Sequence, residues 1–239
     1  MIALIDYKAG NLTSVKKALA TIGADVLIPD GPEALREARG IIVPGVGHFG
    51  ATRALDAAWT EAILERVGEG RPLLGICLGL HWLFEGSDEA PDLPGLGLLS
   101  GQCHRLGVRH GEVRLKPDTT YRGVSDAAQP DVRNVRLQAD VRSLRFQANI
   151  EIKVPHVGWN TLSLQREAAI LEGVADQSQV YFTHSYVAPL TSETVAVTEH
   201  GEPFTAVVQR ANIAGVQFHP EKSGEVGLKI LRNFVQLAG

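Results

Sequence analysis

The amino-acid sequence predicts an α/β protein with a central, mostly parallel sheet flanked by helices and additional antiparallel strands in the second half. Two observations carry this prediction. Over the first 84 residues, short apolar runs alternate with stretches of helical periodicity, which is the pattern of βαβ units. Beyond Phe84, short runs of alternating polarity dominate and indicate antiparallel or mixed strands. At 239 residues the chain suits one large domain, residues 1–239, with room for an insertion.

In chain order, the first half contains four predicted strands and three predicted helical stretches. The strands occupy residues 2–6, 24–28, 41–43 and 73–76, the third closed by Pro44. The first helix begins at the capping residue Asn11 and ends at Gly23, and the others begin at Pro32 and around Trp59. In the second half we expect strands at 96–99, 180–183, 195–198, 206–209 and 213–218, and a last helix capped by Ser223. In such a fold, functional residues gather at the carboxyl ends of the parallel strands.

Composition and charge exclude several classes of protein. The net charge of −4 and the pI of about 6.1 give no global reason to expect a nucleic acid or an anionic membrane as partner. The two cysteines, Cys77 and Cys103, form no CxxC pair, so we expect no disulfide framework, no metal site and a reducing, cytoplasmic location. No apolar window reaches 18 residues, which predicts no membrane span, and residues 1–6 are typical of a first strand rather than a signal peptide.

Residues 107–150 differ from their surroundings. They contain five Val-Arg dipeptides, eight basic and five acidic residues, and few large apolar side chains. They show no helical periodicity, and weak alternation at 132–146 is compatible with a small hairpin. We therefore predict a surface insertion, flexible or a small β hairpin, whose basic surplus either contacts an acidic partner or is simply solvated.

The turn Gly75-Ile76-Cys77-Leu78-Gly79 lies between two apolar runs. This is the layout of a nucleophile elbow with cysteine in place of serine. The glycines remove side chains where strand and helix would collide, and the N-terminus of the next helix favours thiolate over thiol. The N–H of Leu78 is suited to bind an oxyanion. Taken alone, the stretch fits a buried structural cysteine equally well.

A base for this nucleophile is predicted at His219-Pro220-Glu221, which follows the apolar run 213–218. In extended chain, residues two apart project to the same side, and Pro220 restricts the backbone between them. Glu221 is thus able to orient the ring of His219 and favour its imidazolium. With Cys77, these residues make a Cys-His-Glu triad. A histidine that only hydrogen-bonds locally at a strand end is the alternative.

The glycine-rich stretch Pro44-Gly45-Val46-Gly47-His48-Phe49-Gly50 formally matches the dinucleotide fingerprint G-x-G-x-x-G. It follows the third strand rather than the first, and no acidic residue stands at the end of a following strand about 20 positions on. We therefore favour a loop whose N–H groups, that of Val46 in particular, form the other half of an oxyanion hole beside Cys77. Glycines on both sides of Val46 would let its peptide rotate into or away from that hole.

The elbow and the His-Pro-Glu segment together resemble the class I (triad) glutamine amidotransferases. The glycine-rich loop and Pro155-His156-Val157-Gly158-Trp159-Asn160 narrow the resemblance to glutaminase subunits of imidazole glycerol phosphate synthase. The four motifs occur in the same order, and the resemblance covers nearly the whole chain apart from residues 107–150. It implies the class I amidotransferase (flavodoxin-like) fold, no cofactor, and a heterodimer with a (β/α)8-barrel cyclase.

The resemblance also implies an activity for named residues. Glutamine is hydrolysed to glutamate and ammonia, and the ammonia is channelled to the cyclase for synthesis of imidazole glycerol phosphate and aminoimidazole carboxamide ribotide in histidine biosynthesis. Cys77 is the implied nucleophile, His219 the acid and base, Glu221 its orienter, and the N–H groups of Val46 and Leu78 the oxyanion donors. The implied glutamine contacts are Gly47, His81, Glu89, Ser185 and Tyr186, and the implied interface and ammonia passage comprise Asn11, Pro155, His156 and Trp159.

One position departs from the family pattern. His81 stands where the family usually has glutamine, four residues after the nucleophile, and on a helix this returns to the face of Cys77. A neutral histidine can donate one hydrogen bond but lacks the paired donor and acceptor of an amide. The sequence therefore predicts weaker or more pH-dependent glutamine binding, unless histidine substitutes adequately.

Other functions remain open at this point. One alternative is a triad glutaminase that serves another acceptor synthase, such as anthranilate or pyridoxal phosphate synthesis, although the 155–160 segment disfavours both. A second alternative, motivated by His81 and the insertion, is a catalytically impaired binding subunit. A dinucleotide-dependent oxidoreductase is the least favoured.

Overall fold

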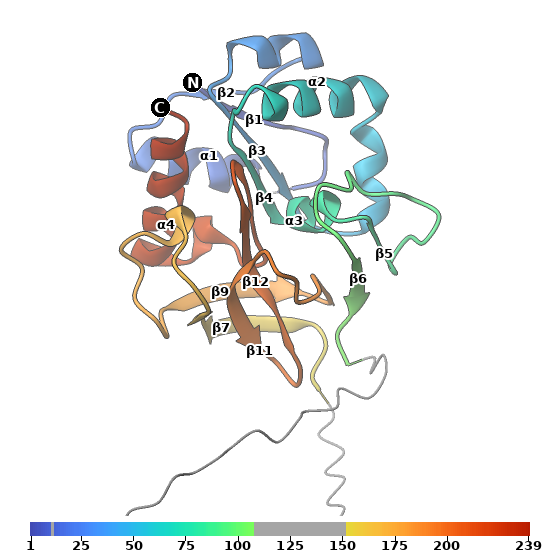
Figure 1. Ribbon diagram of the computed structural model, residues 1–239, viewed down its shortest axis with the longest axis vertical. Helices are drawn as coiled ribbons and strands as arrows, with labels where there is room; N and C mark the ends of the chain where they lie inside the picture. Colours follow the sequence, from blue (N-terminus) through green and yellow to red (C-terminus); the bar gives the residue numbers. More distant parts are fainter. Residues whose placement is uncertain (11, 108–151) are drawn as a thin grey trace, which may run out of the picture. The chain divides into compact units, whose positions relative to one another are not determined.

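The computed structural model describes residues 1–10, 12–107 and 152–239. Asn11, with its predicted capping role, and residues 108–151 lie outside the described residues, and so does all of the predicted insertion except Gly107. In the described part, a central sheet has helices on both faces (Figure 1), so the predicted α/β class is confirmed. No described helix is long and apolar enough to cross a membrane.

The central sheet has eight strands in the order β2-β1-β3-β4-β13-β12-β11-β8. Strands β2, β1, β3, β4 and β13 pair in parallel, and the remaining pairs are antiparallel. The bounds are β1 Ile2–Leu4, β2 Val26–Leu27, β3 Gly40–Gly45, β4 Leu73–Cys77, β8 Ser163–Leu164, β11 Thr194–Glu199, β12 Pro203–Arg210 and β13 Ile213–Val216. The parallel half is fully buried along β1, β3, β4 and β13, which explains why these strands are continuous apolar runs in the sequence.

The described residues also form two smaller sheets. The first contains β10 (Tyr186–Val187), β6 (Gln102–Arg105) and β5 (Gly86–Ser87). The second pairs β7 (His156–Thr161) with β9 (Gln179–His184) in antiparallel register, His156 opposite His184. The pair β7–β9 brings the 155–160 segment alongside the run that contains Ser185 and Tyr186.

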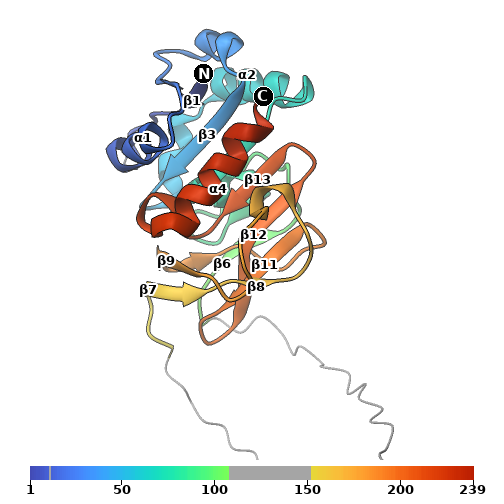
Figure 2. The ribbon, with the colours of Figure 1, turned by 90° about the vertical axis from the view of Figure 1, so that its left-hand side faces the viewer.

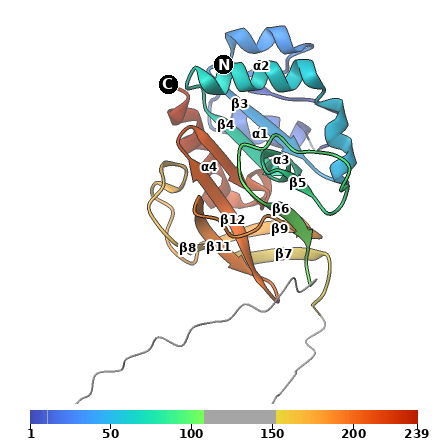
Figure 3. The same ribbon diagram turned by 45° about the vertical axis from the view of Figure 1, so that its right-hand side comes forward.

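Among the described residues, four α-helices cover the central sheet: α1 Leu12–Thr21, α2 Ala57–Gly68, α3 Leu78–Leu83 and α4 Gly224–Leu237. Short 3-10 helices occupy η1 Pro32–Glu37, η2 Phe49–Ala54, η3 Ala169–Leu171 and η4 Pro220–Lys222. Figure 2 shows the face of the sheet that α1 and α4 cover. Helix α3 follows β4 directly and lies beside β5 (Figure 3).

Each face of the sheet has its own apolar core because strand side chains alternate between faces. On one face Ile2, Leu4, Leu74, Ile76 and Cys77 join the apolar sides of α1 and α4. On the other, Ala3, Ile41, Val43 and Leu78 join residues of α2 and α3. Both faces of the sheet are therefore covered by packed side chains. The loops at the carboxyl ends of the parallel strands are where functional residues gather in such folds.

Several predicted elements need correction. Residues 96–99 form no strand, because the N–H groups of Leu96 and Leu99 bond to the carbonyls of Trp82 and Leu83 instead of to a neighbouring strand. Strand β3 is not closed by Pro44 but continues to Gly45. Ser223 occupies the N-cap position of α4 without capping it: its hydroxyl donates to the carbonyl of His219 at 2.7 Å. The sequence analysis also missed β7 as a strand.

Candidate active site

Cys77 lies at the junction of β4 and α3, in a strained backbone conformation with φ 52° and ψ −104°. Such left-handed values are uncommon for a residue with a side chain and cluster at functional sites. A Cβ on Gly79 would overlap the carbonyl of Val43, and a Cβ on Gly75 would collide with the backbone of Gly79. Both glycines are thus required for the close passage of strand and helix. The result is a nucleophile elbow in three dimensions.

His219 and Glu221 form a buried pair. The Nδ1 atom of His219 lies 2.9 Å from Oε1 of Glu221, and the side chains are 2% and 1% exposed. The two residues meet through a turn, not through extended chain as the sequence analysis assumed, because a 3-10 helix begins at Pro220. The backbone of His219 is held on both sides: its N–H donates to the carbonyl of Tyr181 at 2.9 Å, and its carbonyl accepts from Ser223.

The electrostatic surroundings of His219 favour its protonated form. Burial alone would lower the pKa of His219, but its electrostatic interactions with Cys77 and with Glu221, whose Oε1 faces Nδ1, raise this pKa to about 9. At neutral pH the ring is therefore an imidazolium coupled to the cysteine. This is the charge state that a group needs before it can protonate a leaving amine.

A cavity of about 280 Å³ opens at the elbow. Its lining comes from the elbow, the glycine-rich loop, and the segments around Pro155 and Ser185: Gly47, Cys77, Leu78, His81, Glu89, Pro155, Thr183, His184, Ser185 and Tyr186. All five residues predicted to contact glutamine are in this set. Thr183 and His184 were not assigned to the site from sequence, although they belong to the same Thr183–Tyr186 run, which was the available signal.

The glycine-rich loop is fastened to the cavity wall. The N–H of Phe49 donates to Oε2 of Glu89 at 2.6 Å. The N–H of Val46, a predicted oxyanion donor, donates to the carbonyl of Ala9 at 3.1 Å. In this conformation that N–H is already engaged, and only a rotation of the Gly45–Val46 peptide would free it for an oxyanion at Cys77.

His81 is buried and makes a defined hydrogen bond. Its Nε2 lies 2.8 Å from Oε1 of Gln217, whose Nε2 in turn lies 3.8 Å from the sulfur of Cys77. Burial lowers the pKa of His81 to about 4 despite the bond to Gln217, so the ring is neutral at physiological pH. Because Oε1 of Gln217 can only accept, Nε2 of His81 carries the ring proton and donates it to Gln217. The other ring nitrogen, Nδ1, is then an acceptor for a substrate. The lowered pKa argues against the more pH-dependent glutamine binding that the sequence predicts for His81.

Three of the four predicted interface residues, Pro155, His156 and Trp159, lie on or beside β7, and the fourth, Asn11, is outside the described residues. Pro155 lines the cavity, and Nδ1 of His156 lies 3.1 Å from Nε2 of His184, which also lines it. Trp159 is 54% exposed and Val157 is 57% exposed. Strand β7 therefore has an apolar outer side and an inner side that touches the cavity wall through one histidine pair.

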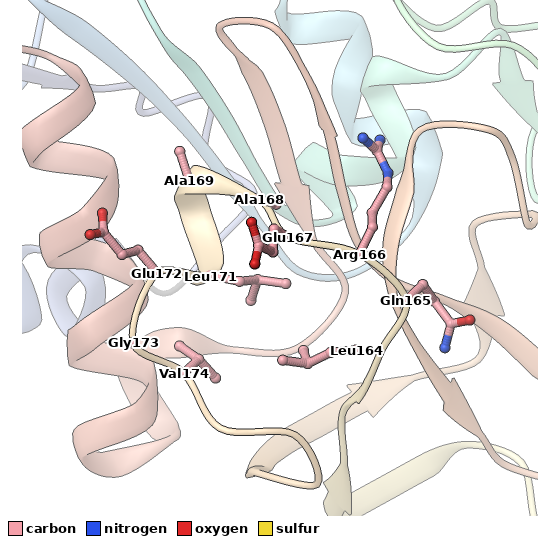
Figure 4. A pocket seen from close by; sticks show the side chains of 10 residues that line it. All are labelled: Leu164, Gln165, Arg166, Glu167, Ala168, Ala169, Leu171, Glu172, Gly173 and Val174. Atoms are coloured by element: carbon pink, nitrogen blue, oxygen red, sulfur yellow. The ribbon is translucent and has the colours of Figure 1, made fainter.

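A larger hollow of about 770 Å³ lies elsewhere, in the loop from Leu164 to Val174 (Figure 4). Leu164, Leu171 and Val174 point into it, whereas Gln165 and Arg166 point away. The residues that line it include no cysteine and no histidine, and they offer no pair of a nucleophile and a base. We therefore assign the chemistry to the smaller cavity at Cys77.

The comparisons with known proteins concern the family and the fold of the chain. The chain belongs to the family described as "Glutamine amidotransferase class-I", whose sequence model matches residues 3–237. A solved structure titled "Crystal structure of glutamine amidotransferase" covers all of both chains with a TM-score of 0.63 at 20% identity. "Structure of PurLQS from Thermotoga maritima" covers 98% of this chain and 97% of its own with a TM-score of 0.63 at 15% identity, and both likenesses concern the fold alone.

Relatives in sequence narrow the class to the HisH family. "Imidazole glycerol phosphate synthase subunit HisH" of Methanothermobacter thermautotrophicus is 38% identical over 238 residues, 99% of this chain and 98% of the relative. The protein of the same name from Thermococcus kodakarensis is 38% identical over 243 residues, 99% of this chain and 100% of the relative. That of Bacillus cereus strain B4264 is 37% identical over 237 residues, 98% and 93% of the two chains.

Proposed function

We propose that the chain is the glutaminase subunit of an imidazole glycerol phosphate synthase, which hydrolyses glutamine and passes the ammonia to a (β/α)8-barrel cyclase partner in histidine biosynthesis. The observation that carries the proposal is the cavity at Cys77, in which a strained elbow cysteine is coupled to the buried His219–Glu221 pair. The names of the relatives supply the acceptor reaction and the existence of a synthase complex.

The chemistry follows from the charge states of the site. The Cys77 thiolate attacks the carboxamide carbon of glutamine, and the imidazolium of His219 gives its proton to the departing nitrogen, which leaves as ammonia. His219, now neutral, takes a proton from water, whose oxygen attacks the thioester. Collapse of this second intermediate releases glutamate and restores thiolate and imidazolium. Glu221 holds the ring in one orientation through Nδ1 throughout.

Both tetrahedral intermediates carry a negative oxygen. The first proposed donor is the N–H of Leu78, which follows Cys77 in the chain and begins α3, and the second is the N–H of Val46. Because the Val46 N–H donates to Ala9 in this conformation, we infer that the isolated subunit is in a low-activity state. A missing oxyanion donor typically reduces turnover about 100- to 1000-fold. Rotation of the peptide on cyclase binding would couple glutamine hydrolysis to the acceptor.

The cyclase is proposed to dock on β7 and the adjoining residues. The exposed Trp159 and Val157 give this strand an apolar outer side, and Trp is enriched among residues that dominate binding energy. The contact has a direct route to the cavity, because His156 is hydrogen-bonded to His184 and Pro155 lines the cavity itself. We propose a heterodimer on this basis. A nucleophilic thiol that must stay reduced also favours the cytoplasm.

Co-purification with the cyclase subunit tests the proposal. We expect ammonia release from glutamine to be low for the chain alone and to rise about 100- to 1000-fold in the complex with its ribotide ligand bound. Cys77→Ser is the matched control and should abolish release while leaving the complex intact. Full turnover by the chain alone would refute the peptide rotation, and no turnover in the loaded complex would refute the glutaminase.

A catalytically impaired binding subunit is the competing function, and His81 is its motivation. A glutamine-analogue electrophile separates the two. The proposed glutaminase is labelled at Cys77 in the complex, whereas an impaired subunit that binds the cyclase yields no adduct. An adduct together with stimulation by a different acceptor synthase, and none by the cyclase, would point to another triad amidotransferase.

A further inference from the structure

Gln217 is a buried polar residue beside the site, and the proposed mechanism does not use it. It follows β13, is 0% exposed, and its carboxamide lies between the side chains of His81 and Cys77. Its Oε1 lies 2.8 Å from Nε2 of His81 and 3.4 Å from the backbone N of Ala188, and its Nε2 lies 3.8 Å from the sulfur. Burying a carboxamide is unfavourable unless its donors and acceptors are hydrogen-bonded. These three contacts therefore offset the cost of burying the polar side chain of Gln217.

The orientation of this amide is fixed by its neighbours. The backbone N–H of Ala188 can only donate, so the amide atom that faces it must be the oxygen. The amide nitrogen is then the atom that faces Cys77. The oxygen also requires the proton of neutral His81 to be on Nε2, because an oxygen cannot donate to it. The orientation of this one carboxamide therefore decides two things. It places an N–H donor toward the sulfur of Cys77, and it fixes which ring nitrogen of His81 carries the proton.

We propose that Gln217 is a positioning residue that orients the sulfur of Cys77 and the ring of His81 through opposite ends of its carboxamide. At the sulfur end, an N–H donor is satisfied better by a thiolate than by a thiol, because hydrogen bonds to ionised groups are the stronger ones. The donor also holds the sulfur on one side of an elbow whose backbone is strained. At the ring end, Gln217 leaves His81 with Nδ1 as its acceptor.

This polarity has a consequence for glutamine, which rests on the proposed function. His81 lines the cavity, and with its N–H committed to Gln217 its free nitrogen accepts hydrogen bonds. It is therefore matched to a donor group of glutamine, the α-ammonium or the carboxamide NH₂, and not to its carboxylate. Gln217 thus restricts His81 to the hydrogen-bond donor groups of an amino-acid amide, without itself touching the substrate.

The ionisation of Cys77 has several neighbours that a test must separate. His219 is coupled to it directly and Glu221 through His219, and burial together with Cys77 raises the pKa of Tyr7. The cavity wall also contains Glu89 and His184. None of these groups bonds to the carboxamide of Gln217, so a substitution at 217 changes the sulfur's surroundings without removing them.

The test is the rate at which iodoacetamide alkylates Cys77 as a function of pH, followed by peptide mass spectrometry without glutamine or cyclase. Gln217→Met keeps the volume but removes the donor, and we expect the rate at pH 6.5 to fall about three- to tenfold. Gln217→Glu keeps the shape but turns an oxygen toward the sulfur, and we expect the midpoint of the profile to move up by about one pH unit or more. Gln209→Met, at the opposite end of the β12–β13 pair, is the control and should leave the profile unchanged.

Two results would overturn the inference. One is folded Gln217→Met and Gln217→Glu proteins that are alkylated with the wild-type profile, which is what a merely structural role predicts. The other needs no variant: ¹⁵N NMR of the wild-type His81 ring should show the proton on Nε2, and a proton on Nδ1 contradicts the assigned polarity. Because neither measurement uses glutamine, a failure of the proposed glutaminase would leave this result standing, and the reverse also holds.

Discussion

Replacing Glu221 by glutamine should change how the stability of the protein depends on pH. The substitution keeps the shape of the side chain but removes the charge that lies 2.9 Å from Nδ1 of His219. The pKa of His219 rises from 6.5 to about 9 on folding, and each pKa unit corresponds to about 1.36 kcal/mol. The folded state therefore favours the imidazolium by about 3 kcal/mol, of which the interaction with Glu221 supplies a part.

The sign follows from the direction of this pKa. Because the folded pKa lies above the unfolded one, the stabilisation is fully present below about pH 6.5 and is lost as the pH rises through 9. In Glu221→Gln we expect about 1–2 kcal/mol of this pH-dependent loss to disappear. In Cys77→Ser/Glu221→Gln only burial remains, so the pKa of His219 should fall below 6.5. The protein should then lose stability as the pH falls through 6.5.

Urea unfolding at pH 6.0, 7.5 and 9.5 measures these differences. Glu225→Gln is a suitable control, because that carboxylate is 84% exposed and should show no comparable pH dependence. We expect wild type and Glu221→Gln to differ most at pH 6.0 and to converge at pH 9.5. A constant difference at all three pH values would refute the assignment of the raised pKa to this buried pair.

Four further predictions concern the site and its surroundings. Gly79→Ala should lower the free energy of unfolding by about 1–3 kcal/mol, because the new methyl group overlaps the carbonyl of Val43, and thermal denaturation measures this. Val46→Pro removes the N–H that we propose as the second oxyanion donor, so ammonia release by the ligand-bound complex should fall about 100- to 1000-fold. Trp159→Ala should weaken cyclase binding by about 2 kcal/mol in calorimetry, with little change in the stability of the subunit alone. His81→Gln should lower KM for glutamine by the same factor at pH 6 and pH 8, because the ring is neutral at both.

Matched variants sharpen these tests. Gly68→Ala should be neutral or stabilising, since a Cβ there meets nothing within 4 Å, so equal losses at residues 68 and 79 would contradict the steric argument. Leu190→Ala removes a similarly exposed apolar side chain away from β7, and an equal effect on cyclase binding would count against the β7 surface. A KM ratio for His81→Gln that changes with pH would show that His81 titrates in this range.

The parts of the site that could be predicted from the sequence are those formed by residues that are consecutive in the chain. The elbow at Cys77 and the His-Pro-Glu segment follow apolar runs, and β4 and β13, which are neighbours in the sheet, bring them to the same edge. For the triad, a local pattern and the rule that parallel strands end together were enough. The glutamine contacts, Ser185 and Tyr186 among them, came instead from the resemblance to the amidotransferase family.

What sequence reasoning missed depends on contacts between distant segments. The bond from His81 to Gln217 spans 136 positions, and nothing in either neighbourhood predicts it. The engagement of Val46 by the carbonyl of Ala9 is a backbone contact, to which side-chain patterns are blind. Residues 96–99 alternate like a strand but bond to the end of α3, because a partner strand is decided by tertiary structure.

Two neighbouring residues of the elbow pack in different apolar cores. Cys77 packs in the core shared with α1 and α4, while the next residue, Leu78, packs in the core on the opposite face of the sheet. The positions of the proposed nucleophile and of the proposed oxyanion donor next to it in the chain are therefore set by two separate groups of side chains. Loss of volume in either core would displace one partner relative to the other. Under selection for faster or slower turnover, substitutions should therefore accumulate on both faces of the sheet, far from the cavity and without any change in the residues that line it.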